Sequence, residues 1–129
     1  MMEGKKLGDL IIYKQAVECS SIAWDIYKNI PIRYQIHIGN QFLRAIDSIG
    51  ANIAEGFGRF HYKDSLKFYY NSRGSLFEAK HWLYLLKKRN LIEEKSFITL
   101  MDLLIKEGVI LNKFINSLIS KSCNSAKTE

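Results

Sequence analysis

One run of polar side chains in the first half of the chain has the spacing needed for charge pairing along a helix. Its members step by three or four positions and so share one helical face: Gln41, Arg44, Ser48, Asn52, Glu55 and Arg59. A second polar group follows, with Arg73, Ser75 and Glu78. Because an unpaired buried charge is very costly, the arginines and glutamates of the two groups predict a paired network that joins two helices. We interpret this network as structural and not as catalytic.

The sequence gives little support for a metal site or for a catalytic nucleophile. Glu78 and His81 have the Glu-x-x-His spacing of di-iron bundles, but such sites need two copies of the motif and two further glutamates. His37 and His61 have no Cys or carboxylate neighbours at metal-ligand spacing. No arginine and histidine have the separation found in helical ribonucleases, and neither a Gly-rich phosphate loop nor a Ser-His-Asp signature is present. We therefore expect no enzymatic activity, no metal and no cofactor.

Basic side chains recur at helical spacing in the second half of the chain. The candidates for nucleic-acid contacts are Lys80, Lys87, Lys88, Arg89, Lys106 and Lys113. Aligned around an assembled particle, such side chains could track phosphates without base specificity. For any one lysine alone, a solvated surface position is the simpler interpretation. The sequence has no aromatic RNA-recognition platform and no helix-turn-helix motif.

Four segments carry the apolar period of a helix and must position these residues. We predict helices over residues 9–29, 34–57, 62–89 and 93–120. Residues 1–8 are expected to form a flexible tail and residues 121–129 a disordered one. The clearest buried ridge, in the second helix, consists of Ile38, Phe42, Ile46, Ile49 and Ile53.

Residues that begin, interrupt or end helices set the predicted boundaries. Asp9 is the expected N-cap of the first helix. Gly50 predicts a kink or a close backbone approach, and Gly56 and Gly58 are expected to end the second helix. Asn90 is the expected left-handed stop after the third helix. Short connections between long helices predict an all-α, antiparallel, up-down-up-down four-helix bundle. Several helices are apolar on more than one face, which predicts an oligomer interface.

Composition limits the class of protein. The chain has 129 residues, 47% hydrophobic and 25% charged, which is typical of one globular domain. The net charge of +6 favours polyanionic partners, although it also serves solubility. Two cysteines are too few for a disulfide framework, so a reduced, cytoplasmic protein is expected. Neither a secretory signal nor a membrane span is evident, and we expect no membrane partner.

The polar groups also carry a family resemblance. The string QxxRxxxSxxANIAEGxxR, followed by RGSxxEA, resembles the signature of four-helix-bundle proteins encoded in intervening sequences of bacterial large-subunit ribosomal RNA genes. The resemblance covers about residues 7–120, with Gly50 at a position where many members have proline. The family carries a ribosomal-protein-like label and is related to the accessory variability protein of diversity-generating retroelements. The resemblance implies a homopentameric, barrel-like ring and an expectation of nucleic-acid binding.

Two functions remain open at this point, and a metal-dependent bundle enzyme that uses Glu78 and His81 is a distant third. The first is a non-enzymatic, homo-oligomeric helical bundle that binds RNA or DNA through basic surfaces. The alternative is a protein-binding scaffold or adaptor whose positive charge serves solubility alone. Binding that depends on salt concentration would separate the two, because neutralised phosphates release counterions.

Overall fold

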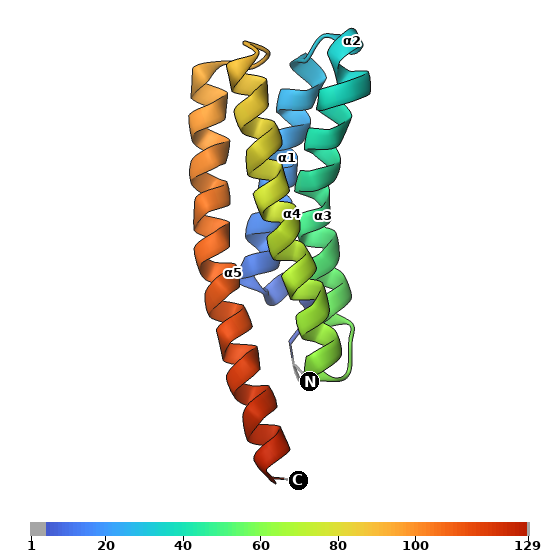
Figure 1. Ribbon diagram of the computed structural model, residues 1–129, viewed down its shortest axis with the longest axis vertical. Coiled ribbons are helices and arrows are strands. Elements are labelled where there is room, and N and C mark those ends of the chain that lie inside the picture. The colour runs from blue at the N-terminus through green and yellow to red at the C-terminus, as the bar shows by residue number, and fades with distance from the viewer. Residues whose placement is uncertain (1–4, 129) are drawn as a thin grey trace.

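The computed structural model describes the backbone of residues 5–128 and the side chains of residues 5–124. Its elements, in chain order, are η1 (Leu7–Asp9), α1 (Ile11–Asn29), α2 (Ile32–Tyr34), η2 (Gln35–Gly39), α3 (Asn40–Phe57), α4 (Tyr62–Lys88) and α5 (Glu94–Thr128). Figure 1 shows the four long helices lying side by side, with the start of α1 and the end of α5 toward the same end of the bundle. The all-α fold class is confirmed, since the described residues form helices and no strand.

One apolar core runs between the four long helices. The ridge predicted for the second helix is confirmed, because all five of its side chains are buried: Ile38, Phe42, Ile46, Ile49 and Ile53. Helix α1 contributes a narrow stripe of small and branched residues, namely Ile12, Ala16, Cys19, Ala23 and Ile26. The small side chains let α1 and α3 approach closely. A Cβ atom added at Gly50 would lie 3.5 Å from the Cβ atom of Ala16, in ordinary contact. Gly50 therefore marks a close approach, and α3 runs across it as one continuous α-helix.

The irregular turn lies earlier, in η2, which is π-helical. The ring of Tyr27 from α1 packs on this segment, where a Cβ atom at Gly39 would come 3.3 Å from the ring. Hydrogen bonds add to the contact: Gln35 Nε2 donates to the Tyr27 carbonyl at 2.9 Å, and the Tyr27 hydroxyl donates to Asn40 Oδ1 at 2.8 Å. A π-helical turn holds one extra residue, and its backbone here is fixed from outside by α1.

The N-terminal boundary differs from the prediction. Asp9 as the N-cap of the first helix is wrong, because its carboxylate accepts the backbone N–H of Lys6 at 3.0 Å and so closes η1. The N-cap position of α1 is Leu10. Part of the predicted flexible tail, residues 7 and 8, is thus a 3-10 turn, while residues 1–4 lie outside the described residues.

The C-terminal boundary also differs. A disordered tail was predicted from residue 121, but α5 continues to Thr128, and residue 129 lies outside the described part. An α-helix satisfies its backbone hydrogen bonds internally and needs no partner helix to continue. No Pro or Gly follows Gly108 to end it.

Candidate nucleic-acid interface

The predicted charge network between the second and third helices does not form. Glu55 pairs within its own helix with Arg59, whose Nη2 lies 3.1 Å from Glu55 Oε2, and both side chains are exposed. Arg59 also lies over the ring of Phe68, 4.6 Å from its centroid. Asn52 Nδ2 donates to the Ser48 carbonyl at 2.9 Å, again within α3. The polar stripe of α3 is therefore a surface stripe of local contacts.

Arg73 and Glu78 of α4 form their hydrogen bonds with residues other than those of that stripe. Arg73 donates to Asn112 Oδ1 on α5 at 3.3 Å, and Glu78 accepts from Trp82 Nε1 at 3.3 Å within α4. Ser75 is half-buried. The rotation of α4 about its axis decides these partners, and a pattern of residue types does not fix that rotation.

A different residue links α3 and α4. The buried Ser72 hydroxyl donates to the Ile49 carbonyl at 2.8 Å. Ser72 and the equally buried Ser65 interrupt the apolar face of α4. This link was not predicted, although a serine at a core position of a helical period is the sequence signal for it.

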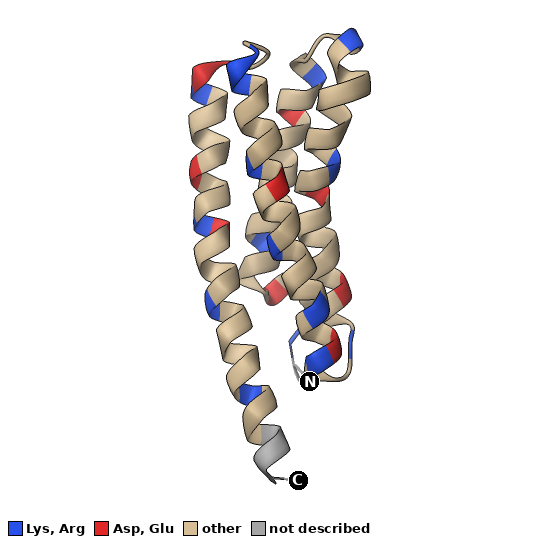
Figure 2. Ribbon diagram, viewed as in Figure 1, with Lys and Arg blue, Asp and Glu red and all other residues tan. Residues whose placement is uncertain are grey.

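The six predicted basic residues do not form one stripe. Lys87 lies at the junction of α4 and α5, 3.1 Å from Glu94 Oε1 and 4.4 Å from the ring centroid of Phe97. Arg89 faces another helix, because it lines a pocket with residues of α3. Lys106 and Lys113 are exposed on α5. Figure 2 shows Lys and Arg spread over all four long helices and interspersed with Asp and Glu.

The outer face of α4 carries an aromatic row that the sequence analysis also missed. Three exposed rings, each seven residues from the next, are those of Tyr70, Phe77 and Tyr84. A cationic side chain from three or four residues later in the chain lies over each ring. The distances to the ring centroids are 5.1 Å for Arg73 over Tyr70, 5.1 Å for Lys80 over Phe77 and 6.0 Å for Lys88 over Tyr84. We call this set the α4 row. An exposed aromatic residue followed by Lys or Arg at i+3 or i+4 is the sequence signal for such contacts.

Among the side chains that the structure describes, one carboxyl group lies in the core. Glu107 is fully buried on α5, and neither of its carboxylate oxygens has a hydrogen-bond partner among the described residues. Burial raises the pKa of Glu107 to about 8. Burial, with a smaller contribution from Glu107, raises the pKa of the Cys19 thiol to about 12. Glu107 lies three residues after Leu104 and four before Leu111, both of which are buried, so its spacing alone could have revealed its burial.

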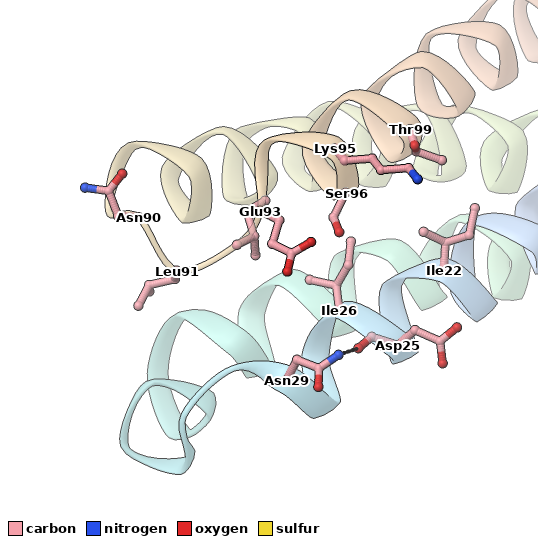
Figure 3. Close-up of a pocket in the computed structure, with 11 residues that line it drawn as sticks. Ile22, Asp25, Ile26, Asn29, Asn90, Leu91, Glu93, Lys95, Ser96 and Thr99 are labelled. Atoms are coloured by element: carbon pink, nitrogen blue, oxygen red, sulfur yellow. Dashed lines mark hydrogen bonds between the residues drawn. The ribbon is translucent and has the colours of Figure 1, made fainter.

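Two open pockets lie toward the same end of the bundle. The first, of about 550 Å³, lies between the end of α1 and the start of α5. Figure 3 shows Ile22 and Ile26 of α1 facing the α5 side, with the carboxylates of Asp25 and Glu93 near its rim. Asn29 Nδ2 donates to the Asp25 carbonyl at 2.9 Å. Within residues 5–128, no group of three or more His, Cys, Asp or Glu side chains could hold a metal ion.

The second pocket, of about 580 Å³, lies between η2, the first turns of α3 and the end of α4. It brings the predicted residues Gln41, Arg44 and Arg89 together with Trp82 and His37. Asp47 is the acidic side chain that lines this pocket. We call it the η2 pocket.

Comparisons with known proteins agree with this geometry. The family profile described as 23S rRNA-intervening sequence protein matches residues 8–113. A protein of unknown function from the S23 ribosomal protein family of Bacteroides thetaiotaomicron VPI-5482 has a similar crystal structure, with a TM-score of 0.73 and 20% sequence identity. The alignment covers 82% of this chain and 96% of that one. A search of curated proteins gives no match. None of the helices in the described residues is both long and apolar enough to cross a bilayer.

Proposed function

The chain belongs to the 23S rRNA-intervening sequence protein family, and on this basis we propose that it is a non-enzymatic, cytoplasmic protein that binds nucleic acid as a homo-oligomer. In this proposal an up-down-up-down four-helix bundle assembles into a ring-like particle, a pentamer by family resemblance. The particle binds RNA or DNA through charge and stacking, without reading base edges.

The α4 row is the observation that carries the nucleic-acid part of the proposal. Its rings repeat every seven residues, or about 10 Å along a helix axis. Proteins that bind single strands combine cations that follow the backbone with aromatic faces on which bases stack. Lys80 and Lys88 lie over rings of this row, so one surface offers both kinds of contact. The net charge of +6 per chain adds a favourable field that grows with each copy in an assembly.

Exposed apolar side chains on α5 support self-association. Ile98, Ile105 and Val109 are each about half exposed, at 49%, 49% and 50%. They lie opposite the buried stripe that contains Leu100 and Leu104. A monomer would leave this surface in water, whereas a second copy packed on α5 would cover it.

The test is binding of a labelled single-stranded RNA across a salt series. Affinity should fall steeply between about 50 and 200 mM salt, because several phosphates are neutralised. Lys88→Glu should weaken binding more than Lys14→Glu, a matched charge reversal on the exposed face of α1. Tyr84→Ala should weaken binding, and Tyr84→Phe should retain it, because phenylalanine keeps the stacking face. Equal losses for Lys88→Glu and Lys14→Glu would contradict the assignment to α4.

The alternative function is a protein-binding scaffold. Exposed apolar residues on a second helix, Val17 and Trp24 of α1, favour it, because they offer more apolar surface than one interface on α5 would cover. An oligomer that binds no RNA even at low salt would support this alternative and overturn the nucleic-acid proposal.

A further inference from the structure

We propose that the η2 pocket binds one nucleotide unit of a single-stranded nucleic acid, with its phosphate on Arg44 and Arg89 and its base against Trp82. This inference rests on the proposed function and names a site away from the α4 row. The pocket joins residues distant in sequence, since His37 belongs to η2, Gln41 and Arg44 to α3, and Arg89 follows the last turn of α4.

The two arginine side chains of the pocket have no partner within the described residues. The chain has five arginines, and three of them have partners: Arg33 lies over the ring of Tyr34, Arg59 pairs with Glu55, and Arg73 donates to Asn112. The other two are Arg44 and Arg89. Neither side chain has an ion pair, a hydrogen bond or a ring contact within the described residues, and both line this one pocket.

Two free guanidinium groups in one pocket favour a phosphate. Guanidinium presents a planar set of donors that matches the oxygens of a phosphate, and charge-assisted bonds of this kind are the strong ones. Gln41 lines the same pocket and supplies an amide group for further hydrogen bonds. Asp47 offsets one of the two positive charges, which leaves a net attraction for an anion.

Trp82 gives the pocket an aromatic wall of fixed orientation. Its Nε1 donates to Glu78 Oε2 at 3.3 Å, and its ring meets the ring of His81 edge-on at 4.9 Å between centroids. The side chain is half-buried and lines the pocket. A base stacked on an aromatic side chain contributes roughly 1–3 kcal/mol, so ring and arginines together select a nucleotide over free phosphate.

The backbone around the pocket is held in place. The π-helical turn of η2 forms one wall, and π-helical turns occur frequently at functional sites. Tyr27 packs on Gly39 and hydrogen-bonds to Asn40, so that α1 supports the turn from outside the pocket. The site is therefore formed before a ligand arrives.

The experiment uses the fluorescence of Trp82 in a Trp24→Phe protein. Trp24 and Trp82 are the two tryptophans of the chain, and Trp24 is half exposed on α1 outside the pocket. Adenosine 5′-monophosphate should quench the emission, and adenosine or inorganic phosphate alone should do so at least about tenfold more weakly. Arg44→Gln with Arg89→Gln should raise the dissociation constant by about tenfold or more. The control variant, Lys14→Gln with Lys121→Gln, removes the same charge from exposed positions outside the pocket and should leave the dissociation constant unchanged.

Each outcome separates this site from the proposed function. An equal response of both double variants to the nucleotide would overturn the site while RNA binding in the salt series still stands. Quenching by the nucleotide without any RNA binding would retain the site and overturn the wider function. Loss of oligomer mass in the Arg44→Gln, Arg89→Gln protein would overturn the inference, because the arginines would then pair with carboxylates of a second copy.

Discussion

The ring of Tyr69 lies against the backbone of Gly56, so closely that a Cβ atom at Gly56 would be 2.9 Å from the ring's Cζ. Phe114 of α5 meets the same ring edge-on, at 4.9 Å between centroids. The glycine of the ANIAEG string is therefore required for packing of α3 against α4. Gly56 and Gly58 were expected to end the second helix; the end is confirmed at Phe57 with Gly58 as its C-cap, and Gly56 lies inside the last turn of α3.

Gly56→Ala should destabilise the protein. The added methyl group has no room beside the fully buried Tyr69 ring, and overpacking of this kind costs roughly 1–3 kcal/mol. Gly74→Ala is the matched control, since no atom lies within 4 Å of a Cβ atom there and α4 should gain up to about 1 kcal/mol. Urea denaturation of the two variants measures both effects. Equal midpoints would show that the ring moves aside at no cost.

Ser72→Ala should lower the free energy of unfolding by roughly 1–3 kcal/mol. The change leaves the buried carbonyl of Ile49 without the hydroxyl that donates to it at 2.8 Å. Ser75→Ala, one turn away and half-buried, is the control and should change stability by less than about 0.5 kcal/mol. Thermal unfolding followed by circular dichroism gives the comparison. A larger loss for the control would place the polar link between the helices elsewhere.

Glu107 should make stability fall as pH rises. The folded protein keeps the proton of Glu107 up to a pKa of about 8, whereas the unfolded chain releases it near the ordinary value of 4.5. Its stabilising contribution is therefore complete below about pH 4.5 and is lost progressively as pH rises toward about 8.

The matching measurement is urea unfolding between pH 5 and pH 9 for the original protein and for Glu107→Gln. The variant stays neutral, so the part of the pH dependence due to this group should disappear, and the variant should be relatively more stable at pH 8. Glu18→Gln, an exposed change on α1, should retain the original dependence. Identical profiles for the original protein and Glu107→Gln would mean that the carboxyl ionises without cost in the folded state.

Ile105→Asp should dissociate the proposed oligomer. The isoleucine is half exposed in the single chain, and an aspartate in an apolar interface would be buried without a partner. Thr99→Asp places the same charge on another side of α5 and should leave the assembly intact. Light scattering after size exclusion should give a mass several times the 15.0 kDa of one chain for the original protein and the control. A single-chain mass for the original protein would contradict self-association.

Apolar spacing predicted the features that depend on one helix alone. The period of Ile46, Ile49 and Ile53 was enough to identify a buried ridge, because each helix must turn its apolar face to the core. Asn90 was predicted as a left-handed stop and has a φ of 57°. Side-chain chemistry at a single position was sufficient there, since Asn tolerates this conformation better than most residues.

Features that depend on how helices are rotated against one another were not predictable from spacing. Arg73 was assigned a glutamate partner on the second helix, yet it donates to Asn112 on α5. The π-helical turn of η2 has no signature in residue types, and its support by Tyr27 appears only when α1 and α3 are side by side. The pairing of Arg44 with Arg89 in one pocket has the same origin, since it joins two helices.

The length of α5 has a practical consequence for handling the protein. A helix of 35 residues is about 52 Å long, and Figure 1 shows α5 extending past the end of the other three long helices. Leu118 is the last buried residue among the described side chains of α5, so the helix continues beyond the core of the bundle. A fluorophore or affinity tag fused after α5 therefore starts beyond the bundle, at the end opposite the η2 pocket.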